Sequence, residues 1–210
     1  NVNCSPEGDD WQDEKKSVAL TIEEGVRAKT GCLINNTKSD DTPYFLTCDH
    51  STEEDALGDS TLSWNFMFMY ETDSCSNPQE EPQWKELGSG AVLLANISKD
   101  NGSDFALLRL NKDPKEIFSK DTLTFYDSLY YAGWDRTNDQ PSGEVGIHHQ
   151  MGDVKKISTV NGGPWYGSNQ FDVSWDSTSH GHSVTGKGSS GFPLFNFNAK
   201  VIGQLSSNTE

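Results

Sequence analysis

The sequence predicts an all-β protein of short antiparallel strands, and three observations support this. Apolar and β-branched residues gather in short runs, and clusters rich in Asn, Asp, Gly and Pro separate them. Helical periodicity is weak, whereas the runs recur at nearly regular spacing. This pattern is typical of a β-sandwich or a β-barrel. With 210 residues, the chain is long enough for one large all-β unit or two small barrels.

The expected strands follow one another along the chain. Those identified by apolar content are residues 17–22, 61–70, 90–94, 104–110, 123–126, 144–147, 170–175, 192–195 and 201–205. A further apolar strand begins at Phe45 and runs into His50. Residues 113–118 fit one short turn of helix between two strands. We therefore place a boundary there, with one barrel in residues 1–114 and another in residues 115–210.

Composition and charge limit the classes of function. Hydrophobic residues make up only 33% of the chain, but their gathering in runs argues against disorder. The net charge of −16 argues against a nucleic-acid partner, because phosphate binding needs a basic surface. The same charge would attract cationic substrates, or it is simply a solvated acidic coat. No run of 18 apolar residues occurs, so we expect no membrane span.

Cysteines and glycosylation sequons indicate a secretory route. The four cysteines suit two disulfides, for which three pairings are open. Four N-x-S/T sequons accompany them, at Asn3, Asn35, Asn96 and Asn101. Because Asn1 is not a translation start, we interpret the chain as processed and expect an extracellular location. Neither His148-His149 nor the His180–His182 pair has an evident third ligand, so we expect no metal and no cofactor.

The strongest chemical signal is the turn Gly-Ser-Ser-Gly-Phe-Pro at residues 188–193. Flanking glycines allow a tight turn that would expose the hydroxyl of Ser190 as a nucleophile. The backbone amides of Gly188 and Ser190 would then converge on a developing oxyanion. Taken alone, the same segment is better explained as a Gly/Ser surface turn.

Two further segments fit the partners of such a nucleophile. His50 ends an apolar strand, where an imidazole can act as a general base. Asp104 begins another strand, where a carboxylate can orient that imidazole. Each residue alone has a simpler explanation, as an exposed histidine or an aspartate that opens a strand. Together with Ser190 they follow the order His, Asp, Ser, which is that of chymotrypsin-like barrels.

These motifs resemble the lysyl endopeptidase branch of the chymotrypsin-type serine proteases. The segments that carry the resemblance are residues 44–50, 103–108, 132–136, 146–149, 155–158, 188–193 and 201–205. They extend from about Cys4 to Leu205, which is nearly the whole chain. The resemblance implies two antiparallel six-stranded β-barrels of the chymotrypsin fold. Because the sequence stops soon after Leu205, we expect the second barrel to lack its last strand, which a partner chain or a further segment would complete.

The resemblance also implies roles for individual residues. Ser190 corresponds to the nucleophile, His50 to the general base and Asp104 to its orienting partner. Trp165 corresponds to an active-site aromatic residue that contacts substrate. Gly186 occupies a substrate-binding position where the family has an acidic residue.

Other positions depart from the family. Lys187 adds a positive charge beside Gly186, and Ser206 stands where the family has a second active-site histidine. Ser189 precedes the nucleophile, where trypsins have an acidic residue that pairs with a new N-terminal amine. Ser189 argues against a trypsin-type activation switch. The changes at Gly186, Lys187 and Ser206 weaken the case for lysine specificity, because a buried cationic side chain needs a counter-charge.

The resemblance guides the disulfide prediction as well. The family pairs a cysteine directly after its catalytic histidine with one on the preceding strand, and these positions hold Ser51 and about Lys29 here. Cys32 lies three residues after Lys29, and Cys48 lies three residues before Ser51. Opposed residues of an antiparallel pair have a constant sum of residue numbers, and the two cysteines have the same sum as the family pair. We therefore predict a Cys32–Cys48 bond, although an odd shift moves side chains to the other face. Cys4–Cys75 remains as the second bond and resembles a family pairing.

The function that follows is a secreted serine endopeptidase that forms an acyl-enzyme and cleaves protein or peptide substrates, with cleavage after Lys as one specificity. The alternative is a catalytically inactive protein that uses the protease fold for binding or extracellular assembly. The three triad residues favour the enzyme, and the altered pocket positions favour the alternative.

Overall fold

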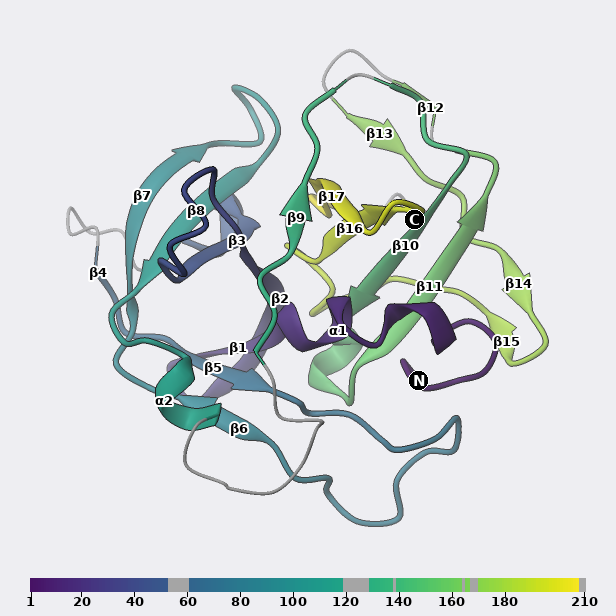
Figure 1. Ribbon diagram of the computed structural model, residues 1–210, viewed down its shortest axis with the longest axis horizontal. Helices are drawn as coiled ribbons and strands as arrows, with labels where there is room; N and C mark the ends of the chain where they lie inside the picture. The colour runs from purple at the N-terminus through teal and green to yellow at the C-terminus, as the bar shows by residue number, and fades with distance from the viewer. Residues whose placement is uncertain (53–60, 119–128, 138, 164, 167–169, 208–210) are drawn as a thin grey trace.

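The computed structural model describes the chain except for residues 53–60, 119–128, 138, 164, 167–169 and 208–210. The described residues are mostly β-structure, and the prediction of an all-β fold is confirmed (Figure 1). Short helices flank the strands, namely α1 (Glu14–Ser17), α2 (Lys115–Phe118) and three single 3₁₀ turns at Asp9–Trp11, Asp49–Ser51 and Gln150–Gly152. In this described part, no helix is long and apolar enough to cross a membrane.

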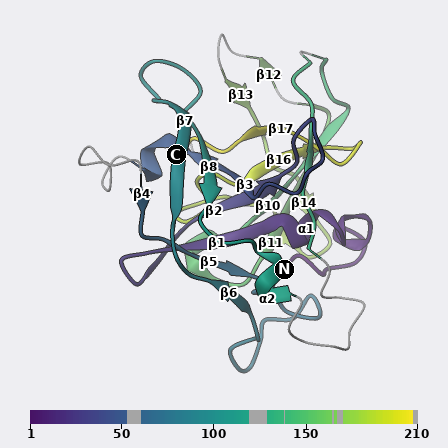
Figure 2. The ribbon, with the colours of Figure 1, turned by 60° about the vertical axis from the view of Figure 1, so that its left-hand side comes forward.

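The larger sheet contains eight of the described strands and comes from the first half of the chain. In spatial order its strands are β4 (Thr61–Leu62), β7 (Ala91–Ile97), β8 (Phe105–Leu110), β3 (Tyr44–Cys48), β2 (Val26–Ile34), β1 (Val18–Glu23), β5 (Asn65–Phe68) and β6 (Lys85–Leu87). The sheet curls, so that β7 and β8 run across the direction of β1 in Figure 2.

The smaller sheet contains five described strands from the second half of the chain. In spatial order they are β11 (Lys156–Asn161), β10 (Gly143–His148), β16 (Pro193–Asn196), β17 (Lys200–Gln204) and β9 (Gly133–Trp134). Two short hairpins accompany it, formed by β12 (Trp165–Tyr166) with β13 (Phe171–Asp172) and by β14 (Ser177–Thr178) with β15 (Gly181–His182).

Strands β2 and β3 lie between two hydrophobic cores because both of their faces are apolar. Leu33 and Phe45 point into the core of the first sheet. Their neighbours Cys32 and Leu46 join Ile147 in the second core. Side chains on a strand alternate between its faces, so a strand covered on both sides shows an unbroken apolar run. This explains why the segment that leads into the predicted catalytic histidine is mostly apolar, with Thr47 as the polar residue of β3.

The N-terminal segment packs on the second sheet, although the sequence prediction counted it with the first barrel. The rings of Trp11 and Phe195 pack in a tilted arrangement with centroids 5.8 Å apart, and the amide of Val2 donates to the carbonyl of Lys155 at 3.0 Å. The segment is drawn in purple beside β11 in Figure 1. The boundary between residues 114 and 115 stays a prediction.

A buried ion network fixes this segment. The carboxylate of Glu71 forms salt bridges with Lys15 Nζ at 2.6 Å and with Lys155 Nζ at 3.1 Å. All three side chains are nearly inaccessible to solvent. Burial acts to raise the pKa of Glu71, but the ammonium groups of Lys155 and Lys15 outweigh it and lower that pKa to about 2. The three charges therefore form one hydrogen-bonded unit between the N-terminal segment, the first sheet and the second sheet.

Most expected elements are present, and the exceptions have physical reasons. The helical turn at 113–118 is confirmed as α2, and the strand expected at 123–126 lies outside the described residues. The expected strand 61–70 is divided into β4 and β5, while 170–175 shrinks to β13. Strands β2 and β11 were not among the strands identified by apolar content, because their lysine, glycine and polar residues hide the apolar pattern.

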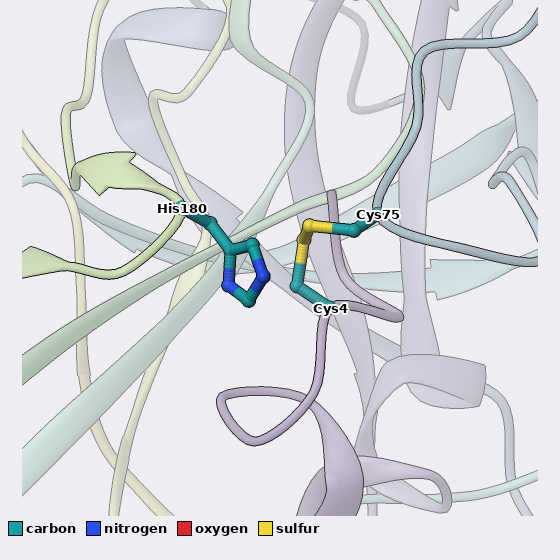
Figure 3. Close-up of side chains that lie close together, drawn as sticks. All are labelled: Cys4, Cys75 and His180. Carbon is teal, nitrogen blue, oxygen red and sulfur yellow. A yellow bond between two sulfur atoms is a disulfide. The ribbon is translucent and has the colours of Figure 1, made fainter.

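One predicted disulfide is confirmed and the other is wrong. Cys4 and Cys75 are bonded, with His180 beside them (Figure 3). Cys32 and Cys48 are free and buried. The observed register pairs Cys32 with Leu46, so Cys48 lies two residues further along the same face. Diagonal neighbours of this kind are roughly 7–8 Å apart in antiparallel sheets, too far for a disulfide.

Candidate active site

Antiparallel pairing of β3 and β8 brings His50 and Asp104 together. Cys48, the last residue of β3, pairs with Phe105, the first residue of β8. A single 3₁₀ turn after Cys48 carries His50, and Asp104 directly precedes Phe105. Asp104 Oδ2 lies 2.7 Å from His50 Nδ1, and its Oδ1 accepts the backbone amide of His50 at 2.9 Å. The carboxylate thus fixes both the position and the ring orientation of the histidine.

Asp104 is held in an unusual backbone conformation. Its φ of 55° lies in the left-handed region, which costs on the order of 1 kcal/mol for a residue other than glycine. Its carbonyl accepts the Asp49 amide and the side chain of Gln204, each at 2.9 Å. Asp104 is only 1% exposed, whereas the side chain of His50 is 31% exposed. The acid is therefore enclosed while the imidazole reaches the surface, as a triad requires.

Ser206 is a member of this site that the sequence analysis mentioned only as a departure from the family. Its hydroxyl donates to Asp104 Oδ2 at 2.7 Å. The same carboxylate oxygen therefore receives both the His50 imidazole and the Ser206 hydroxyl. No motif in the sequence marks Ser206, because its role depends on the strand β17 that brings it next to β8.

The turn that carries Ser190 is clamped onto the first sheet. Thr30 of β2 donates its amide to the Ser190 carbonyl at 3.0 Å and its hydroxyl to the Gly188 carbonyl at 2.9 Å. Gly188 and Gly191 have φ of 87° and 80°, which favour glycine. A side chain at Gly191 would collide with Thr47 of β3. The close approach of the turn to β2 and β3 therefore requires these glycines.

The predicted triad is only partly assembled in the structure. Across the described residues, no hydrogen bond joins Ser190 Oγ to His50. The Nε2 atom of His50 instead lies 3.5 Å from the sulfur of Cys48. The amides of Gly188 and Ser190 have no acceptor among the described residues, whereas the Gly191 amide donates to Leu205 at 2.8 Å. The two unbonded amides suit the predicted oxyanion hole, whose role stays a prediction.

A neutral hydrogen-bond chain supports the turn from behind. Ser189 Oγ accepts the Gly186 amide at 3.2 Å and lies 2.8 Å from His148 Nδ1. His148 Nε2 in turn lies 3.0 Å from Ser158 Oγ. Burial lowers the pKa of His148 to about 3, so its imidazole is neutral. An acid at position 189 would need a cationic partner here, and the neutral His148 does not supply one. The hydrogen-bond chain therefore agrees with serine at position 189.

A cavity of about 1060 Å³ opens between the two sheets next to this site. Leu205 and Ser206 connect it to the groups around Asp104 and Ser190. Its other walls come from both sheets and include apolar residues and three charged ones, among them Phe105, Trp134, Asp135, Arg136, Asp172, Trp175, Thr185 and Phe192. A partly apolar cavity of this kind suits the side chain of a peptide substrate, although neither Ser190 nor His50 lines it.

The two predicted substrate-binding residues are not tested by this geometry. The backbone of Trp165 pairs with Asp172 in the β12–β13 hairpin, and its side chain is outside the described part. Gly186 accepts the Ser189 amide at 2.9 Å. A Cβ atom at Gly186 would lie 2.8 Å from Gln150 Nε2, so the structure shows it as a close-packed part of the nucleophile turn.

A curled antiparallel β fold with an imidazole–carboxylate pair on one sheet and a glycine-flanked serine turn on the other defines a serine protease of trypsin-like fold. The family comparison is more specific. The sequence model described as "Lysyl endopeptidase, C-terminal domain" matches residues 1–209, and the chain belongs to this family.

Solved structures agree with this fold. The crystal structure of Deg5 is 13% identical, with a TM-score of 0.56 over 94% of this chain and 82% of that one. A human pathogenic astrovirus serine protease is 13% identical, with a TM-score of 0.52 over 93% and 85% of the two chains. The HtrA-type protease AlgW is 12% identical, with a TM-score of 0.52 over 92% and 52%. At such identities the similarity shows the fold alone, and it confirms the predicted chymotrypsin-type architecture.

Proposed function

We propose that this protein is a serine endopeptidase that cleaves peptide bonds through an acyl-enzyme on Ser190. The observation that carries the proposal is the His50–Asp104 pair, in which a buried carboxylate bonds both the ring and the backbone of a partly exposed histidine. Such a pair prepares the imidazole to accept a proton at Nε2. Membership of the lysyl endopeptidase family supports peptide-bond hydrolysis as the reaction that this pair serves.

The mechanism follows from the positions of these groups. His50 takes the hydroxyl proton of Ser190 as the serine oxygen attacks the substrate carbonyl, and later returns it to the leaving amine. The hydrogen bond from Ser190 to His50 Nε2 forms when substrate binds, since catalytic hydrogen bonds are often long or unformed in the free enzyme. The amides of Gly188 and Ser190 stabilise the oxyanion. Water then hydrolyses the acyl-enzyme.

We propose cleavage after Lys as the specificity, in keeping with the family. The net charge of −16 favours the approach of a cationic segment. Asp135 and Asp172 line the cavity beside the site and can supply the counter-charge that a lysine side chain needs. Trp165 and Gly186 are the proposed substrate contacts on the hairpin and the turn.

We further propose that the protein is secreted. The Cys4–Cys75 disulfide requires an oxidising compartment to persist. Among the four predicted glycosylation sites, Asn101 is exposed, and its amide contacts only Ser98. Asn3 is less suited to carry a glycan, because its side chain accepts Lys15 at 2.7 Å and donates to the Thr72 carbonyl at 2.7 Å. Asn35 is half-buried, and Asn96 donates its amide to Asp49 at 2.7 Å.

One observation favours the second candidate, an inactive protein of the same fold used for binding. The contact of His50 Nε2 is with the Cys48 thiol and not with Ser190. If that arrangement persists in the presence of substrate, the histidine cannot act as the base for Ser190.

Covalent labelling with a fluorophosphonate probe separates the two candidates. We expect labelling at Ser190, found by peptide mapping, which is abolished in His50→Ala and retained in Ser207→Ala, a variant of a nearby exposed serine. Peptide substrates that differ only in Lys, Arg or Leu before the scissile bond then measure specificity. A folded protein with an intact Cys4–Cys75 bond that takes up no probe would establish the binding candidate instead.

A further inference from the structure

We propose that Cys48 and His50 form an inhibitory binding site for a thiophilic cation such as Zn²⁺ or Cd²⁺. The cation would bridge the sulfur of Cys48 and the Nε2 atom of His50. Its inhibitory effect rests on the proposed protease function, whereas its binding does not. Bound at Nε2, the cation removes the lone pair that would otherwise accept the proton of Ser190.

The distance between the two ligand atoms fits a shared tetrahedral cation. Cys48 Sγ and His50 Nε2 lie 3.5 Å apart. Zinc–sulfur and zinc–nitrogen bonds of about 2.3 Å and 2.0 Å, opened at a tetrahedral angle, place the two ligand atoms about 3.5 Å apart. Cys48, His50 and Asp104 also form a group whose ligand atoms all lie within 4.8 Å of one another.

The groups around this pair are those that support metal ligands. Asp104 Oδ2 holds His50 Nδ1 at 2.7 Å, so the lone pair of the neutral ring lies at Nε2. Carboxylates that orient a histidine in this way recur around zinc sites. The hydroxyl of Ser51 lies 2.7 Å from Cys48 Sγ and can donate to it as a thiolate. Asp104 is therefore an orienting group in this proposal, as it is in catalysis.

The surroundings of Cys48 and the exposure of His50 favour cation binding over other uses of the Cys48 thiol. Cys48 is buried, and its observed neighbours exclude a disulfide with Cys32, so oxidation to that bond does not account for it. Its burial also makes it a poor nucleophile toward substrate. The side chain of His50 is 31% exposed, which leaves coordination positions open toward solvent for water. Three protein ligands are not needed for an inhibitory ion, because water can fill the remaining positions of a zinc site.

Binding is tested first on the full chain carrying Ser190→Ala, which cannot turn over substrate. Titration with Cd²⁺ should produce the ultraviolet absorption of a cadmium–thiolate bond, saturating at one equivalent. The absorption should be lost in Ser190→Ala combined with Cys48→Ala or with Cys48→Ser, and kept with Cys32→Ala. Cys32 is the matched control, because it is also free and buried, on the strand adjacent to β3. Retained absorption in folded Cys48 variants, or its absence from Ser190→Ala, would overturn the site.

Inhibition is then measured on the protein with Ser190 intact. Zn²⁺ should block peptide hydrolysis reversibly, with recovery on addition of EDTA. The inhibitory concentration should rise by at least about tenfold in Cys48→Ser relative to Cys32→Ala, as for loss of a zinc-supporting group. Equal inhibition of both variants would refute the proposal. A protein that binds Cd²⁺ through Cys48 but hydrolyses no peptide would leave the site standing and remove only the proposed protease function.

Discussion

Glu144 is a buried carboxyl group on β10, and its replacement by Gln should stabilise the protein above neutral pH. The residue is fully inaccessible to solvent, and neither carboxyl oxygen has a hydrogen-bond partner among the residues that the structure describes. Burial without a partner raises the pKa of Glu144 to about 7 from its ordinary value of 4.5. Ionising this group therefore requires more free energy in the folded protein than in the unfolded chain.

The size and sign of the effect follow from linkage. A difference of one pKa unit corresponds to 1.36 kcal/mol, so the shift of Glu144 corresponds to about 3 kcal/mol. The folded state binds this proton more tightly than the unfolded state. Its contribution to stability is therefore fully present below pH 4.5 and is lost as the pH rises toward and through 7. Glu144→Gln keeps the shape but cannot ionise, so it should escape this loss.

Urea unfolding between pH 4.5 and pH 8 measures this difference directly. The gap in unfolding free energy between Glu144→Gln and the wild type should grow by about 3 kcal/mol over that interval, in favour of the variant. Glu80→Gln, which removes an exposed carboxyl group, should run parallel to the wild type. Parallel curves for Glu144→Gln as well would show that the carboxyl group is solvated or bonded in solution, and the reasoning would fail.

Three further changes test other parts of the fold and site. Ser206→Ala should lower kcat/KM for a peptide substrate about tenfold, because the carboxylate that orients His50 loses one donor, and an unchanged value would contradict this role. His148→Ala should lower the unfolding free energy by about 2 kcal/mol and weaken probe labelling, since Ser189 loses its buried partner; wild-type labelling would refute the link. Cys75→Ser should cost about 4 kcal/mol in chemical unfolding through loss of the loop constraint, and a cost below about 1 kcal/mol would argue against it.

The site could be predicted where the sequence places a functional residue at the end of a strand. His50 follows the apolar run of β3, and Asp104 precedes the apolar run of β8. Antiparallel neighbours bring the end of one strand to the start of the other. That β3 and β8 are such neighbours does not follow from local pattern, because four strands separate them in the sequence, and the expectation came from the residue order of chymotrypsin-like barrels.

The register between neighbouring strands could not be predicted from the local sequence pattern. The Cys32–Cys48 prediction took its register from the family, whereas Cys32 stands opposite Leu46 here. A displacement of two residues keeps both thiols on one face but separates them. The role of Ser206 could not be predicted for a related reason, because its hydrogen bond to Asp104 depends on how β17 lies against the first sheet. Contacts between sheets depend on packing that no single segment encodes.

Two of the buried carboxyl groups, Asp104 and Glu144, show why burial alone does not define a site. Both are almost inaccessible to solvent and both belong to or adjoin strands. Asp104 accepts hydrogen bonds from the His50 amide and the Ser206 hydroxyl and also holds the imidazole, whereas Glu144 has no hydrogen-bond partner in the described part of the chain. A charge in such an environment is stabilised by its donors, so Asp104 can support an imidazolium that Glu144 could not. The turn after β3 supplies the donors of His50, and the residues after β17 supply the hydroxyl of Ser206. The chemistry of the site therefore depends on the pairing of β3 with β8 and on the position of β17.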